Sequence, residues 1–155
     1  MNLEEIQQTI PNRPPYLWVD EVVSLDGDQI HTRKRLDPEL PVFAAHYPDF
    51  PVFPAALQCE CVYQASAILI AKLGVSTVGK VPVVARANNS KFRKMAQPGD
   101  LLDVHVSLEN RYKDVFFLKG RVLRGGETVA SLDFVTTATE RPAPAACMTE
   151  ASDAE

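Results

Sequence analysis

The stretch PAALQCECVYQASAILIAKL, residues 54–73, is the only long run in this chain whose composition favours an α-helix. Pro54 suits a first helical turn, and Gly74 suits the end of a helix. Most residues in the run are apolar, and a helix of that kind is usually buried. We therefore predict one long buried helix that the rest of the domain must cover.

The sequence on both sides of this helix has the alternation of apolar and polar residues that is typical of β-strands. We predict strands over 16–25, 29–36, 81–92, 102–108, 115–123 and 128–139. Turn residues separate them, among them Asp26-Gly27-Asp28. We also predict a short helix over 2–9 and a stiff, irregular, proline-rich loop over 37–54. An antiparallel sheet that curls over the helix would bury it all round, which predicts an α+β fold.

Composition excludes several classes of protein. The chain has 155 residues, enough for one domain, and a net charge of −4 that does not suit nucleic-acid binding. No apolar run is long enough to insert in a membrane, and residues 1–10 do not resemble a signal peptide, so we expect a cytoplasmic protein. We predict one domain over 1–140 and a disordered, proline-, alanine- and acid-rich tail over 141–155.

The cysteines give no indication of a metal site or a disulfide framework. The chain has three cysteines, an odd number: Cys59, Cys61 and Cys147. The C-x-C spacing of the first two is not that of a zinc site. Two of them fall in the predicted helix, where small buried thiols are common.

His46 is the candidate base among three histidines. His31 and His105 fall on polar faces of their strands, and we expect both to be solvated. His46 instead lies in an apolar segment between prolines, directly before the predicted helix. Two interpretations stay open for it: a functional histidine, or a core histidine whose hydrogen bonds are satisfied.

Glu60 is the candidate acid. It lies two turns into the apolar helix, where a buried carboxylate is costly unless it is paired or its raised pKa is used. Gln64 follows at i+4 on the same face and can bond to it. The alternative is a glutamate on an exposed stripe. The free N–H groups at Ala55 and Ala56 could polarise a carbonyl oxygen, which suits proton abstraction beside a carbonyl.

These residues form a pattern that resembles a known family. The run from Ala45 to Gln64, A-H-Y-P-x-x-P-V-F-P-A-A-L-x-x-E-x-x-x-Q, is similar to G-H-F-P-x-x-P-x-M-P-G-x-L-x-x-E-x-x-x-Q of the (3R)-hydroxyacyl-acyl carrier protein dehydratases of fatty acid synthesis. Residues 10–20, IPNRPPYLWVD, resemble that family's P-H-R-x-P-F-L-L-V-D stretch. Lys91-Phe92-Arg93 and Pro98-Gly99-Asp100 resemble two further elements, so the similarity covers about residues 6–139.

The resemblance implies a hot-dog fold, in which a curved antiparallel sheet surrounds one helix. It implies a dimer whose sites are shared, with His46 from one chain and Glu60 from the other, and further assembly such as a trimer of dimers or a heteromer. In the implied mechanism, an N–H near Ala55 or Ala56 polarises the thioester carbonyl and His46 removes the α-proton. Glu60, oriented by Gln64, protonates the leaving hydroxyl. No metal or organic cofactor is implied.

Two departures from the family pattern bear on the substrate. Ala45 and Ala55 replace glycines and each add a methyl group near the expected thioester. We therefore hypothesise a specialised dehydratase of a polyketide or polyene pathway. Asn12 stands where the family has histidine.

The implied partner is an acyl carrier protein, which is acidic. Since this chain is acidic too, docking needs a local basic patch, for which Lys91, Arg93 and Lys94 are candidates, with Arg86 and Arg111 as additions. A solvated charge cluster is the alternative. Two other functions stay open: a hot-dog acyl thioesterase, and a non-catalytic acyl-binding subunit.

Overall fold

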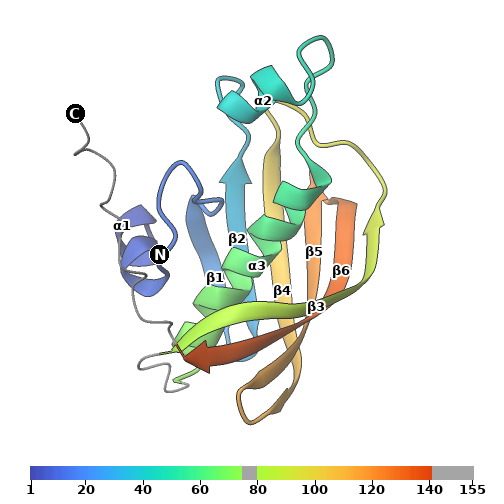
Figure 1. Ribbon diagram of the computed structural model, residues 1–155. Coiled ribbons are helices and arrows are strands. Elements are labelled where there is room, and N and C mark those ends of the chain that lie inside the picture. The colour runs from blue at the N-terminus through green and yellow to red at the C-terminus, as the bar shows by residue number, and fades with distance from the viewer. Residues whose placement is uncertain (75–79, 141–155) are drawn as a thin grey trace, which may run out of the picture.

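The computed structural model describes residues 1–74 and 80–140, and Figure 1 shows a long helix lying across a curved sheet. The elements, in chain order, are α1 (Leu3–Thr9), β1 (Glu21–Asp26), β2 (Gln29–Arg35), α2 (Pro41–Ala45), α3 (Ala55–Lys72), β3 (Lys80–Phe92), β4 (Leu101–Tyr112), β5 (Val115–Arg124) and β6 (Glu127–Glu140). The long predicted helix is thus α3, and the predicted short helix is α1.

All six strands belong to one antiparallel sheet in the order β1-β2-β4-β5-β6-β3. Figure 1 shows β6 and β3 curling past the carboxyl-terminal half of α3. β3, which precedes β4 in the chain, pairs only with β6 and forms one edge of the sheet. The predicted α+β fold, a curved antiparallel sheet around one long helix, is confirmed.

One glycine sets how closely α3 approaches the sheet. Gly120 on β5 faces the helix, and a Cβ atom there would lie 2.2 Å from Cγ1 of Val62. Both residues are buried, so only a residue without a side chain fits this contact. β5 and α3 are thereby packed together without a gap.

The sheet does not cover the helix all round, contrary to our expectation. Cys59, Glu60, Tyr63 and Ala67 are only half-buried, while the neighbouring residues Val62, Gln64, Ala65, Ser66 and Ile68 are buried. These half-buried residues recur at helical spacing and form one stripe along α3. The sheet of one chain therefore leaves open the stripe that carries Glu60.

Two other local predictions were wrong. Residues 16–20 form no strand. The side chain of Gln64 takes the hydrogen bonds in the middle of the segment: Trp18 N–H donates to Oε1 of Gln64, and Nε2 of Gln64 donates to the carbonyl of Tyr16. The predicted irregular loop contains the helix α2, which begins with Pro41 at its first helical position.

Some predictions fall outside what the structure describes. The predicted disordered tail, residues 141–155, and Cys147 within it lie beyond the described residues, so the division into a domain over 1–140 and a tail stays a prediction. Among the described residues, no helix is both long enough and apolar enough to cross a membrane.

Candidate active site

His46 lies at the end of α2 with one ring nitrogen already engaged. Its Nδ1 is 3.0 Å from the carbonyl oxygen of Val52, and its ring stacks on Tyr47 with centroids 4.2 Å apart. Because a carbonyl can only accept, Nδ1 carries the proton in this bond and Nε2 keeps a free lone pair in the neutral ring. The half-buried imidazole is thus oriented to act as a base through Nε2.

Glu60 is held by Gln64 one turn further along α3. Nε2 of Gln64 donates to Oε1 of Glu60 at 2.9 Å and to the carbonyl of Tyr16 at 2.9 Å. Oε1 of Gln64 accepts the N–H of Trp18 at 2.8 Å. All these partners require one orientation of the amide, which is 3% exposed. Gln64 therefore joins the Glu60 carboxylate rigidly to the backbone of residues 16–18.

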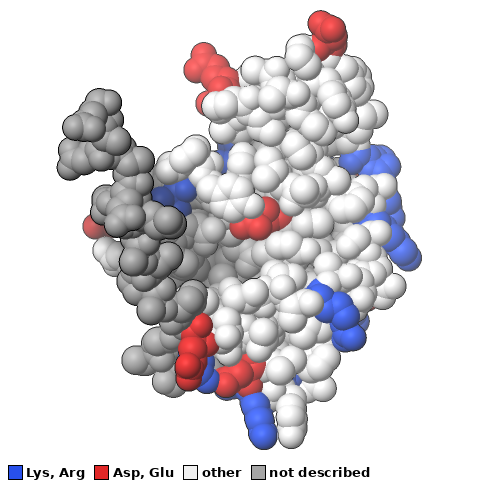
Figure 2. Space-filling view, viewed as in Figure 1, with Lys and Arg blue, Asp and Glu red and all other residues white. Residues whose placement is uncertain are grey.

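Glu60 also lines a pocket of about 280 Å³ between α3 and the edge strand β3. The other lining residues carry no formal charge; they are Pro11, Asn12, Tyr63, Gln64, Ser66, Ala67, Val81, Pro82, Val83, Val84 and Thr136. In Figure 2 the face over α3 is mostly white, with one red patch near its middle and the other charged residues toward its margins. Glu60 thus provides an isolated carboxylate in an otherwise uncharged pocket.

Two tyrosines beside Glu60 were not singled out from the sequence. Burial, and then the Glu60 carboxylate, raise the pKa of Tyr16. Burial, the neighbouring Cys59 and Glu60 raise the pKa of Tyr63 to about 12, so both phenols keep their protons at neutral pH. The i+3 spacing from Glu60 to Tyr63 was a signal for the second; Tyr16 gave none, because it reaches the site through tertiary packing.

The first turn of α3 leaves backbone donors open. Pro54 caps the helix without a side-chain hydrogen bond, and its carbonyl accepts the N–H groups of Leu57 and Gln58. Ala55 and Ala56 are exposed at this end. The N–H groups of Ala55 and Ala56, in the first helical turn, have no partner within the helix and lie at the positive end of its dipole. A carbonyl oxygen placed there can accept hydrogen bonds from them.

The chain does not bring its two candidate acid–base groups into one pocket. His46 does not line the pocket that contains Glu60, and no hydrogen bond joins the two side chains within the described residues. Gln64 and Glu60 are together, whereas His46 belongs to the segment between α2 and α3.

The three candidate docking cations do not form one uniform patch. Lys94 pairs with Glu127, and Arg93 donates to Oγ of Ser131 at 2.9 Å. Lys91 and Arg93 line a groove on the outer face of the sheet, described below. Of the two additional candidates, Arg86 is exposed on β3, and Arg111 lies 5.2 Å from the ring centroid of Phe116.

The expectation that His31 and His105 are solvated was wrong. Both are half-buried, and their rings stack with centroids 4.1 Å apart because β2 and β4 place them opposite one another. Nε2 of His31 also bonds to Oδ1 of Asp103 at 2.7 Å. Alternation along each strand does not reveal such a pair, since it depends on the register between strands distant in the sequence.

A metal site is not evident in the residues described: they contain no cluster of three or more His, Cys, Asp or Glu side chains that could hold an ion. The two described cysteines, Cys59 and Cys61, are not bonded to one another. Burial raises the pKa of both thiols, most strongly for Cys61, so each stays protonated.

Known proteins match this chain over most of its length. A family model for the FabA-like domain matches residues 10–133. The 3-hydroxyacyl-[acyl-carrier-protein] dehydratase FabZ of Rickettsia bellii is 36% identical over 135 residues, which cover 86% of this chain and 93% of the relative. The FabZ of Anaeromyxobacter sp. is 34% identical over 149 residues, which cover 91% of this chain and 92% of the relative.

Solved structures match in fold at low sequence identity. A chain of the dehydratase heterocomplex ApeI:P from Xenorhabdus doucetiae gives a TM-score of 0.73 at 11% identity, with 88% of this chain and 91% of that chain covered. The E. coli PaaI protein gives 0.62 at 13% identity, with 76% and 81% covered. The architecture is the hot-dog fold, and with the family model spanning most of its length, this chain belongs to the FabA-like domain family.

Proposed function

We propose that this chain is a dehydratase that removes water from a 3-hydroxyacyl thioester on an acyl carrier protein and leaves the 2-enoyl thioester. The observation that carries the proposal is the Glu60 carboxylate, fixed by Gln64 on the wall of a pocket without other charges. The FabZ relatives, which carry the name of this activity, support it.

Each proposed role follows from the chemistry of the group. The N–H groups at Ala55 and Ala56 bind the thioester oxygen and stabilise the negative charge that develops there. Nε2 of His46 takes the α-proton, because Nδ1 is bonded to Val52. Glu60, in its protonated form, gives a proton to the 3-hydroxyl, which leaves as water. His46 thus gains one proton and Glu60 loses one, so the substrate loses only water. Transfer of a proton from His46 to Glu60 through solvent restores both groups for the next turnover.

We propose that the two groups meet across a homodimer. β3 is a thirteen-residue edge strand, exposed along most of its length, with Val83 43% and Val84 36% exposed. Long exposed edge strands pair with other chains. A second copy paired at β3 would cover the open stripe of α3 and bring its own His46 toward Glu60. Higher assemblies and heteromers stay compatible with this arrangement.

We also propose that the enzyme is specialised for a polyketide or polyene pathway in the cytoplasm. Ala45 and Ala55 stand where the family pattern has glycine, and Ala55 is exposed at the start of α3, where the thioester is expected. The methyl group of Ala55 narrows the space for the thioester, while the backbone N–H of Ala55 is still present as a donor. Equal or faster turnover of ordinary short-chain fatty-acid intermediates than of substrates on pathway-specific acyl carriers would contradict this part of the proposal.

Carrier docking is proposed at Lys91, Arg93 and Lys94. The segment that follows β3 lies against the start of α3, because Phe53 N–H donates to the carbonyl of Ala96 at 2.7 Å. Lys94, the last of these cations, precedes Ala96 by two residues, so the set leads into the segment that contacts the start of α3. Charge reversal at Arg93 and Lys94 should raise KM for carrier-bound substrate and leave kcat nearly unchanged; an unchanged KM would remove the docking assignment.

Mass spectrometry of carrier-bound 3-hydroxyacyl substrates tests the reaction. Wild type should remove about 18 mass units, the mass of water, while His46→Ala and Glu60→Gln should slow this step by about 10²-fold or more. Release of a free acid would show a thioesterase instead. No reaction on any carrier, with or without a partner chain, would indicate an acyl-binding subunit.

A mixing experiment tests the shared site separately. His46→Ala and Glu60→Gln chains, each inactive alone, should regain activity when they are unfolded together and refolded as a mixture. Random pairing gives one intact site in each mixed dimer, or about one quarter of all sites. If the mixture stays inactive while both variants are dimeric, each site uses His46 and Glu60 of the same chain.

A further inference from the structure

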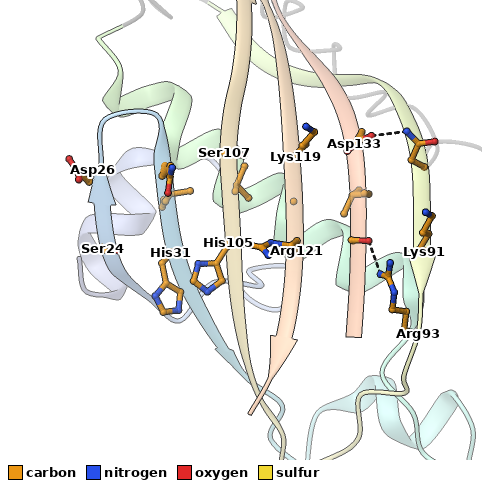
Figure 3. Close-up of a pocket in the computed structure, with 17 residues that line it drawn as sticks. Ser24, Asp26, His31, Lys91, Arg93, His105, Ser107, Lys119, Arg121 and Asp133 are labelled. Atoms are coloured by element: carbon orange, nitrogen blue, oxygen red, sulfur yellow. Dashed lines mark hydrogen bonds between the residues drawn. The ribbon is translucent and has the colours of Figure 1, made fainter. Parts of the chain in front are cut away.

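The outer face of the sheet, opposite α3, carries a row of polar side chains that crosses five strands. His31 on β2 faces His105 on β4, His105 faces Arg121 on β5, Arg121 faces Ser131 on β6, and Ser131 faces Lys91 on β3. These residues line a groove of about 930 Å³, shown in Figure 3. None of these five residues has a catalytic role in the proposed function, and Lys91 alone belongs to the proposed docking set.

The charge of this groove is opposite to that of the whole chain. Its lining contains Lys91, Arg93, Lys119 and Arg121, against the carboxylates of Asp26 and Asp133, whereas the chain carries a net charge of −4. Asp133 accepts a hydrogen bond from Asn89 at 2.7 Å. Lys119 is paired with Glu109 at 2.9 Å. The lining therefore keeps more cations than carboxylates, even with Lys119 paired.

Three cations next to Ser131 in the sheet register or bonded to it have no carboxylate partner. Among the described residues, Lys91, Arg93 and Arg121 take part in no salt bridge. Arg93 donates to Oγ of Ser131, which leaves the hydroxyl hydrogen of Ser131 free to donate to a ligand. Like charges held together without a counterion attract anions.

The cations stand on two sides of β6. Figure 3 shows Arg121 extended toward His105, while Lys91 lies on β3 and Arg93 follows directly after the end of that strand. Since β5 and β3 flank β6, their backbones are about 10 Å apart. A single phosphate contacts one side only. Two linked phosphoryl groups can contact Arg121 with one group and Lys91 or Arg93 with the other, above the Ser131 hydroxyl.

We propose that this groove binds a small molecule that carries a diphosphate group. Arg121 holds one phosphoryl group, Lys91 and Arg93 hold the other, and the Ser131 hydroxyl donates between them. The site lies on the face of the sheet opposite the acyl-thioester pocket, so its ligand is not the group that undergoes dehydration. A nucleoside diphosphate, coenzyme A and free diphosphate share the recognised chemistry.

Isothermal titration calorimetry at low salt tests the site with inorganic diphosphate, inorganic phosphate, ADP and coenzyme A. Wild type should bind diphosphate more tightly than phosphate. Arg121→Gln and Lys91→Gln should each weaken diphosphate binding about fivefold or more, and Ser131→Ala less. Lys72→Gln, which removes an exposed cation from the end of α3, is the matched control and should leave the affinity unchanged. Tighter binding of ADP or coenzyme A would support a nucleotide as ligand, and equal affinities would support the diphosphate alone.

Three results would overturn the proposal: equal affinities for phosphate and diphosphate, an equal loss of diphosphate affinity in Arg121→Gln and Lys72→Gln, or no binding of diphosphate to wild type. If wild type does not bind diphosphate, a raised KM for carrier-bound substrate in Arg121→Gln would assign the groove to a protein partner. Circular dichroism of each variant establishes that it is folded. Because Arg121 lies outside the proposed carrier-docking set, this test does not depend on the proposed dehydratase activity.

Discussion

The two faces of the sheet are built from the same strands and differ in almost every other respect. On β5, Gly120 faces α3 and lies in van der Waals contact with Val62, while the next residue, Arg121, points to the outer groove. At Gly120 the inner face has no room for an added atom, whereas the outer face presents charged side chains to the groove. Alternation along one strand therefore separates residues that determine stability from residues that are available for binding.

The strongest test of this difference is Gly120→Ala. The new methyl group would lie 2.2 Å from Cγ1 of Val62, so α3 or β5 must move. We expect a loss of about 3 kcal/mol in the free energy of unfolding, at the upper end of overpacking effects, measured by urea denaturation. Val62→Ala in the same chain should recover part of this loss.

Arg121→Ala is the control on the opposite face of the same strand. Its free energy of unfolding should stay within about 0.5 kcal/mol of wild type. Equal losses in Gly120→Ala and Arg121→Ala would break the comparison between the two faces.

Next in size is Gln64→Leu, which removes the bonds that tie α3 to residues 16–18. The buried N–H of Trp18 and the part-buried carbonyl of Tyr16 would lose their partner, which should cost about 2 kcal/mol. Turnover should fall as well, because Glu60 loses its support.

Gln58→Leu is the matched control for that prediction, since Gln58 is equally buried on α3. It has one long hydrogen bond to Phe53, at 3.3 Å, and its Oε1 has no partner, so its replacement should change stability little. If both variants lost the same stability, the bonds of Gln64 would not be the cause.

A smaller effect is expected on the outer face for Asp103→Asn. Burial acts to raise the pKa of Asp103, but hydrogen bonds from Arg33 and His31 outweigh it and lower that pKa. The stabilisation is therefore present above the unfolded-state pKa, near 3.8, and is lost as the pH falls through the lower folded-state value. Because the ion pairs are partly exposed, the variant should lose less than about 1 kcal/mol at pH 7 in urea denaturation, and still less at high salt. A loss as large as that of Gln64→Leu would refute the assignment of this face to weak, solvent-screened interactions.

The smallest expected effect concerns His105. Burial, followed by the charges of His31 and Arg121, lowers its pKa below the usual 6.5. The unfolded chain therefore binds the proton more readily, so stability should decline slightly as the pH falls from about 6.5 through the folded-state pKa. NMR titration of the imidazole should give a value below 6.5. His105→Gln should make the stability less dependent on pH in this range; an imidazole pKa above 6.5 would contradict the prediction.

Features that depend on residues close together along the chain could be predicted from the sequence. Features that depend on how distant strands pair in the sheet could not. The bounds of α3 fall within one residue of the predicted 54–73, because composition and the flanking Pro54 and Gly74 determine them locally. The pairing of Gln64 with Glu60 follows from helical spacing. The stack of His31 on His105 does not, because two strands distant in the sequence create it.

Residues 16–20 show a second kind of failure. Their apolar and aromatic character is typical of a strand, yet the backbone of Tyr16 and Trp18 bonds to a side chain of α3. Among the described residues, only at the end of the segment does a backbone bond reach a strand, where Asp20 N–H donates to the carbonyl of Arg33 on β2. A propensity reports that a segment favours extended backbone, and does not report which partner takes its hydrogen bonds. The open stripe of α3 was missed because the prediction assumed that one chain covers its own helix.

The contact between Gly120 and Val62 also constrains how this domain can change its substrate range. A helix pressed against the sheet without a gap cannot shift to accommodate a longer or bulkier acyl group. In the proposed dehydratase, adaptation to new acyl groups therefore falls to the side chains on the open side of α3, such as Tyr63, and to β3 residues that line the same pocket, such as Val84. Libraries that vary these positions and leave Gly120 and Val62 unchanged keep the scaffold intact while the pocket changes shape.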